Sequence, residues 1–140
     1  MVREMDKKEG KRLRICIDID GVVCKLRRPG EAYGNLKPVQ GAIEKIKCLK
    51  AAGHCIILYT ARHMKTCRGN VGKVLALQGA TTLKWLARHG IEYDEIYFGK
   101  PYADVYVDDN ALRFESWDKI EGDGSSLPVS PEKQCKMEGR

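Results

Sequence analysis

Residues 13–24 read LRICIDIDGVVC, an apolar run that carries two carboxylates, Asp18 and Asp20, close to its end. A continuous run of apolar and β-branched residues predicts a buried strand of a parallel sheet. Alternate residues of a strand point to one face, so both carboxylates should project together, and Gly21 permits a sharp turn after them. Carboxylates at such a place need a cation, a proton or a water-filled cleft, because an unpaired charge is costly to bury. The run therefore predicts an active site; the alternative is a surface strand that ends in an ordinary Asp-Gly turn.

The composition indicates one globular domain. The chain has 140 residues, of which 43% are hydrophobic and 31% charged, so a single domain over 1–140 needs no covalent staples. We expect an ordered core at about 12–120 and flexible ends, because both ends are rich in charged residues or in Gly, Ser and Pro. No apolar segment reaches membrane-spanning length and no secretory signal opens the chain, which favours a cytoplasmic protein that does not enter a membrane. The six cysteines form no C-x-x-C pair and are expected to be reduced thiols.

Strand and helix patterns alternate along the rest of the chain. Apolar runs predict further strands at 54–59, 91–98 and 105–107, and helical spacing predicts helices at 38–52 and 76–90. Gly79 costs about 1 kcal/mol relative to alanine and weakens the first turns of the second helix. The alternation predicts an α/β protein with a three-layer, Rossmann-like open parallel sheet.

Polar residues follow each predicted strand. They are Asp18 and Asp20 after the first, Thr60, Ala61 and Arg62 after the second, Lys100 after the third, and Asp108 and Asp109 after the fourth. In an open parallel sheet the ligand crevice lies outside the carboxyl ends of the strands, so these residues should meet there. Carboxylate oxygens suit Mg²⁺, whereas a hydroxyl, a guanidinium and an ammonium suit a phosphoryl group.

A basic loop, which we name the flap loop, spans residues 25–36 directly after the first acidic pair. It contains Lys25, Arg27, Arg28 and Tyr33, which are placed to hang over the same crevice. The alternative is a mobile basic loop with no part in the site.

The motifs DIDGVV, LYTAR, GKP and VYVDDN, in this order, resemble the four sequence motifs of the haloacid dehalogenase (HAD) superfamily of aspartyl phosphotransferases, over roughly residues 12–115. The run TARHM…GNVGKV…WLARHGIEYDEIYFGKP…VYVDDNALRF is similar to the small phosphatases found with capsular and surface polysaccharide biosynthesis genes. The resemblance implies a HAD-like fold, and the short spacing between the motifs leaves no room for a large cap domain.

The resemblance also implies roles. Asp18 would attack phosphorus to form an aspartyl-phosphate, and Asp20 would protonate the leaving oxygen and then deprotonate water. Thr60, the Ala61 amide and Arg62 would bind the phosphoryl group or substrate, and Lys100 would balance negative charge there. Mg²⁺ would lie between Asp18, the Asp20 carbonyl, Asp108 and Asp109.

We therefore expect a Mg²⁺-dependent phosphomonoester hydrolase that acts on a sugar phosphate or polysaccharide precursor, and a homo-oligomer could supply a lid. The net charge of +6 favours anionic partners, which keeps a nucleic-acid end (3′-) phosphatase as an alternative. A receiver-like, non-catalytic phosphate-binding module is another, although Asp20 argues against a stable phosphoaspartate. No G-x-G-x-x-G follows the first strand and no serine sits in a G-x-S-x-G elbow, which excludes the usual dinucleotide enzymes and α/β-hydrolases.

Overall fold

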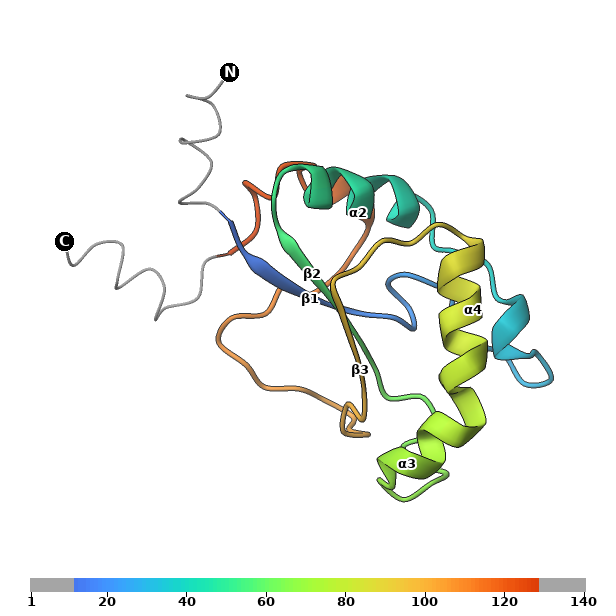
Figure 1. The fold of residues 1–140 in the computed structure, drawn as a ribbon. Helices are drawn as coiled ribbons and strands as arrows, with labels where there is room; N and C mark the ends of the chain where they lie inside the picture. The colour runs from blue at the N-terminus through green and yellow to red at the C-terminus, as the bar shows by residue number, and fades with distance from the viewer. Residues whose placement is uncertain (1–11, 129–140) are drawn as a thin grey trace.

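The structure is a computed structural model, and it describes residues 12–128 (Figure 1). Three parallel strands form one sheet in the order β1-β2-β3, namely β1 Arg14–Asp18, β2 Cys55–Thr60 and β3 Glu95–Phe98. Asp18 is paired with Tyr59, and Thr60 with Phe98. The register therefore brings the carboxyl ends of all three strands to the same edge of the sheet.

Two main helices occupy the crossovers between these strands. Helix α2, Ala42–Ala51, begins after Gly41, whose φ of 86° lies in the left-handed region. It starts later than the sequence predicted because Pro38 is engaged in an isolated bridge with Cys24. The second crossover contains a short helix α3, Val71–Val74, a π-helical segment η2, Leu75–Gly79, and helix α4, Ala80–Arg88. The predicted weakness around Gly79 thus coincides with the end of a π-helical turn.

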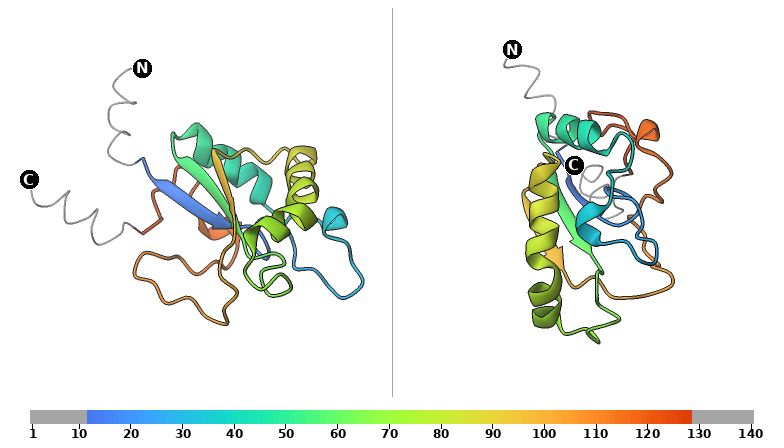
Figure 2. Two further views of the ribbon diagram at one scale, coloured as in Figure 1. Left: turned by 60° about the horizontal axis from the view of Figure 1, so that its bottom comes forward. Right: turned by 90° about the vertical axis from the view of Figure 1, so that its right-hand side faces the viewer.

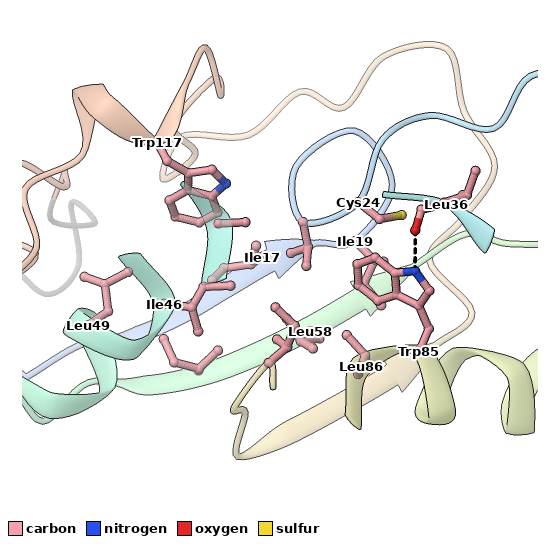
Figure 3. Close-up of a cluster of buried hydrophobic side chains, with 14 of the residues drawn as sticks. Ile17, Ile19, Cys24, Leu36, Ile46, Leu49, Leu58, Trp85, Leu86 and Trp117 are labelled. Carbon is pink, nitrogen blue, oxygen red and sulfur yellow. Dashed lines mark hydrogen bonds between the residues drawn. The ribbon is translucent and has the colours of Figure 1, made fainter. Parts of the chain in front are cut away.

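Both helices pack on the same face of the sheet, as right-handed crossovers in the order β1-β2-β3 require. One hydrophobic cluster joins strands and helices there and includes Ile17, Ile19 and Leu58 from the strand segments, Ile46 and Leu49 from α2, and Trp85 and Leu86 from α4 (Figure 3). A short 3-10 helix η3, Trp117–Lys119, adds Trp117, whose Nε1 donates to the Val22 carbonyl at 2.8 Å. On the opposite face Cys16 and Tyr97 are exposed, so the described residues supply two layers of the fold.

The predicted open parallel α/β sheet is confirmed, and residues 12–128 contain no large cap domain; of the three layers predicted, these residues form two. The fourth strand predicted at 105–107 is wrong. Residues 101–113 form no strand and are exposed, with Val107 96% exposed, and the segment extends from β3 as a long loop (Figure 2). Two of its polar groups are satisfied locally, since the Tyr106 hydroxyl donates to the Pro101 carbonyl and the Asn110 amide donates to the Asp108 side chain. A run of three residues offers few ladder hydrogen bonds to outweigh such local contacts.

The chain beyond residue 120 continues to pack on the domain as far as Leu127. A ring nitrogen of His54 lies 2.7 Å from the Asp123 carbonyl oxygen, and Leu127 packs against the hydrophobic cluster. The predicted flexible ends at 1–11 and 129–140 lie outside the described residues. Within 12–128 the cysteines are free thiols, and no helix there is long and apolar enough to cross a bilayer.

Candidate active site

The site begins with a tight turn after β1. The Ile19 amide still donates to the Tyr59 carbonyl at 2.9 Å, but the Gly21 amide donates to the Cys24 carbonyl at 2.7 Å. Gly21 has a φ of 90°, a conformation that few residues with a side chain adopt. Asp18 is therefore the last residue of the strand and Asp20 lies within the turn. The loop after β3 lies at the same edge of the sheet, because the Lys100 amide donates to the carbonyl of Thr60, the last residue of β2, at 3.1 Å.

Asp18 and Lys100 form the accessible part of the site. Lys100 Nζ lies 3.5 Å from Asp18 Oδ1, and the two side chains are 19% and 33% exposed. Burial raises the pKa of Asp18; the ammonium of Lys100 opposes this rise, whereas the negative charge of Asp20 adds to it. The carboxylate is thus partly withdrawn from water, open on one side and next to a cation.

Asp20 accepts hydrogen bonds from three side chains. Arg62 Nε lies 3.0 Å from Oδ1 and 3.2 Å from Oδ2 of Asp20. The Thr60 hydroxyl donates to Oδ2 at 3.1 Å, and the Cys24 thiol lies 3.4 Å from Oδ1. The Asp20 side chain is 21% exposed and that of Arg62 only 1%, so this ion pair is largely shielded from solvent. The orientation of the Asp20 carboxylate is therefore fixed by donors from three side chains and not by a single salt bridge.

Arg62 is in turn held by groups from other parts of the chain. Its Nη1 donates to the Thr82 hydroxyl at 3.0 Å and its Nη2 to the Cys24 sulfur at 3.2 Å. The guanidinium also lies 4.3 Å from the ring centre of Tyr33. Burial, and then the charge of Asp20, raise the pKa of the Cys24 thiol to about 12, so the thiol stays protonated and can donate to the carboxylate. A buried guanidinium with all these partners has little freedom to move.

The structure brings most of the predicted residues together. Thr60 is fully buried, and its hydroxyl donates to Asp20 and accepts from the Arg62 amide at 3.1 Å. Asp108 and Asp109 instead lie on the exposed loop 101–113, and within residues 12–128 no three His, Cys, Asp or Glu side chains are close enough to hold a metal ion. The roles assigned to these residues stay predictions.

The end of the flap loop is anchored to α4. Trp85 Nε1 donates to the Leu36 carbonyl at 2.6 Å (Figure 3), and Arg88 Nη1 donates to the Gly34 carbonyl at 2.9 Å. Within the loop, Arg27 lies 5.3 Å from the ring centre of Tyr33, on the same ring that the Arg62 guanidinium approaches. Tyr33 is therefore the flap-loop residue that contacts the buried Asp20–Arg62 pair.

Cys24 and Thr82 were not identified from the sequence. Cys24 ends the opening apolar run, where its spacing of four from Asp20 could have drawn attention to it. Thr82 lies on a helix far along the chain, and no local pattern distinguishes it from its neighbour Thr81.

No family profile and no curated protein matches this sequence. Among solved structures, a Vibrio cholerae protein whose description names no activity is 33% identical, with a TM-score of 0.66 over 73% of this chain and 83% of that one. The Pnkp1/Rnl/Hen1 complex matches at 20% identity and a TM-score of 0.48, over 70% of this chain and 31% of that one. The D,D-heptose 1,7-bisphosphate phosphatase of B. bronchiseptica, crystallised with magnesium and phosphate, matches at 22% identity and 0.43, over 62% and 49%. The sequence identities and TM-scores of the last two matches are too low to assign a function to this chain.

Proposed function

This chain belongs to the same family as the Vibrio cholerae protein, and from its site we propose that it is a phosphomonoester hydrolase of the haloacid dehalogenase superfamily. The observation that carries the proposal is the Asp18–Lys100 pair, with 3.5 Å between Oδ1 and Nζ. It lies at the carboxyl edge of a parallel sheet, where ligands of such folds bind. Asp20, the second carboxylate that the chemistry needs, is two residues further along the chain.

The reaction proceeds in two displacements. An oxygen of Asp18 bonds to phosphorus while the bond from phosphorus to the leaving oxygen breaks, and Asp20, which must enter this step in its protonated form, gives that oxygen its proton. Water then attacks the aspartyl-phosphate, Asp20 takes a proton from the water, and phosphate leaves with Asp18 restored. Lys100 stabilises the negative charge that gathers between carboxylate and phosphoryl group. Thr60 and the Ala61 amide, at the end of β2, are the proposed contacts for the phosphoryl oxygens.

Mg²⁺ is part of the proposal because of the donors at this edge. Asp18 would supply a carboxylate oxygen and Asp20 its backbone carbonyl oxygen, the hard ligand type that Mg²⁺ prefers, and a bound cation would shield the nucleophile from the anionic phosphate. Asp108 and Asp109 are the further proposed ligands. In the described structure these two lie on the exposed loop, so the steps above are assigned to side chains alone.

The proposed substrate is a sugar phosphate or a polysaccharide precursor, processed in the cytoplasm. Within residues 12–128 no large cap domain lies over the site, which leaves room for a sugar larger than the phosphate itself. Arg27 and Arg28 of the flap loop are exposed and could contact such a substrate, although the Arg27 Nη1 already donates to the Glu31 carbonyl at 3.1 Å.

A nucleic-acid end phosphatase is the second candidate, and one observation favours it. Two tyrosines near Lys100 are well exposed, Tyr102 at 60% and Tyr106 at 50%. Lys65 Nζ lies 5.4 Å from the first ring centre and Lys100 Nζ 4.4 Å from the second. Aromatic rings beside cations are surfaces on which unpaired bases stack.

A phosphate-release assay separates these functions. The purified protein with Mg²⁺ is given sugar phosphates, nucleotides and 3′-phosphorylated oligonucleotides of several lengths, at low and moderate salt. We expect many turnovers with a sugar phosphate. An oligonucleotide that is the better substrate, with an advantage that grows with length and shrinks with salt, would replace the carbohydrate proposal by the nucleic-acid one. Phosphorylation of Asp18 without repeated turnover would leave only the receiver-like module.

A further inference from the structure

A chain of buried polar side chains runs from the second crossover to Asp20. Gln78, in the π-helical segment η2, is 9% exposed, and Thr82, in α4, is 1% exposed. The Thr82 hydroxyl donates to Gln78 Oε1 at 3.3 Å and accepts from Arg62 Nη1 at 3.0 Å. Arg62 Nε then binds both oxygens of Asp20. The chain thus connects a helix to the proposed acid and base of the reaction.

The hydrogen-bond directions along this chain are mutually consistent. An arginine side chain has donors only, so Thr82 must accept from Arg62 with its oxygen and use its single proton elsewhere. The carbonyl oxygen of the Gln78 side chain takes that proton. Gln78 and Thr82 are four residues apart, and the π-helical segment that contains Gln78 ends between them, at Gly79. Turns of this kind are rare and occur frequently at functional sites.

Nothing in the proposed hydrolysis requires a buried glutamine and threonine on a distant helix. A surface salt bridge could hold Asp20 only loosely, since exposed ion pairs are weak and mobile. Here the guanidinium is held at both ends, with Nε on Asp20 and Nη1 on Thr82, while Tyr33 lies over its plane at 4.3 Å. The Asp20 carboxylate therefore takes its direction from α4.

We propose that Thr82, supported by Gln78, is a positioning residue that acts through Arg62 to orient Asp20 for proton transfer. This inference rests on the proposed function, and it assigns the Arg62 guanidinium to Asp20 rather than to the substrate. Binding of the substrate phosphate by Arg62, the role predicted from the sequence, is the competing assignment, and the two differ in the kinetic constant that they affect.

The test compares Thr82→Val with the neighbouring Thr81→Val. Valine keeps the shape of threonine but removes the oxygen that accepts from Arg62, whereas Thr81 is partly exposed and makes no side-chain hydrogen bond in the described structure. Turnover of an alkyl phosphate, whose poor leaving group needs protonation, is measured beside that of p-nitrophenyl phosphate, whose good leaving group does not. We expect Thr82→Val to lower kcat for the alkyl phosphate about 10-fold or more with KM little changed, a part of the 10²–10⁴-fold that acid–base catalysis supplies. The loss for p-nitrophenyl phosphate and the effect of Thr81→Val should be small.

Two further variants make the result decisive. Arg62→Lys keeps the positive charge but cannot donate to Asp20 and Thr82 at the same time, so it should show the same dependence on the leaving group as Thr82→Val. It replaces Thr82→Val in the test if that variant does not fold. In an Asp20→Asn background, Thr82→Val should cost little more, because the two residues act as one unit. A loss that is equal for both substrates, a rise in KM and in the inhibition constant of inorganic phosphate, or full additivity with Asp20→Asn would each overturn the positioning role. Absence of turnover by the unmodified protein would overturn the proposed function itself. Turnover by the unmodified protein, together with one of the three variant results above, would overturn only the positioning role.

Discussion

Trp85→Phe tests how firmly the flap loop is held to the domain. Trp85 is 1% exposed, and its Nε1 donates to the Leu36 carbonyl at 2.6 Å. Phenylalanine leaves that buried carbonyl without its donor, which costs about 1–3 kcal/mol. It also removes two ring carbons from the core, worth about 0.8 kcal/mol each. The free energy of unfolding should therefore fall by about 3–4 kcal/mol, which for a domain of this size lowers Tm by about 10–15 °C.

Urea unfolding measures the fall in the free energy of unfolding, and limited trypsin digestion measures how far the flap loop is loosened. Cleavage after Arg27, followed by mass spectrometry, should be faster in Trp85→Phe because the loop has lost its anchor on α4. Leu83→Ala is the matched control, since Leu83 is on the same helix but 43% exposed, and it should change stability by only about 0.5 kcal/mol. Wild-type stability in Trp85→Phe together with unchanged cleavage would refute the anchoring.

Asp20→Asn should slow both formation and hydrolysis of the aspartyl-phosphate, with a smaller loss for p-nitrophenyl phosphate than for an alkyl phosphate; equal losses in rapid-quench experiments would count against an acid–base role. Burial raises the pKa of Asp18 in the metal-free protein, so an NMR titration of its carboxyl group without Mg²⁺ should give a pKa above the usual aspartate range. Lys100→Met removes the cation that opposes this rise and should move that titration to higher pH; a titration that stays in place would show that Lys100 does not act on Asp18.

The sequence was sufficient to predict the sheet and which polar residues meet at its carboxyl edge. Apolar runs ended in polar residues four times, and three of the four runs form strands; because parallel strands end at one edge, the residues after these three had to meet. Lys100 next to Asp18 and Thr60 next to Asp20 follow from this rule and from the register of β1, β2 and β3.

Local patterns were insufficient where an outcome depended on distant partners. The run at 105–107 has high β-propensity, but propensity in a strand depends on a neighbour to pair with, and in the structure this run has none. Thr82 and Cys24 meet Arg62 across sequence separations of 20 and 38 residues, which periodicity does not reveal. The direction of the Arg62 side chain, toward Asp20 and away from solvent, likewise required the folded structure.

The central claim is that Asp18 is the nucleophile of a phosphomonoesterase, and phosphate release by Asp18→Asn tests it most directly. Asparagine has nearly the same shape and removes a charge whose burial is unfavourable, so the variant should fold with a Tm close to that of the unmodified protein. We predict repeated turnover of phosphate esters by the unmodified protein in Mg²⁺ and none above background by Asp18→Asn under the same conditions. Substantial turnover by the folded Asp18→Asn variant would contradict the account.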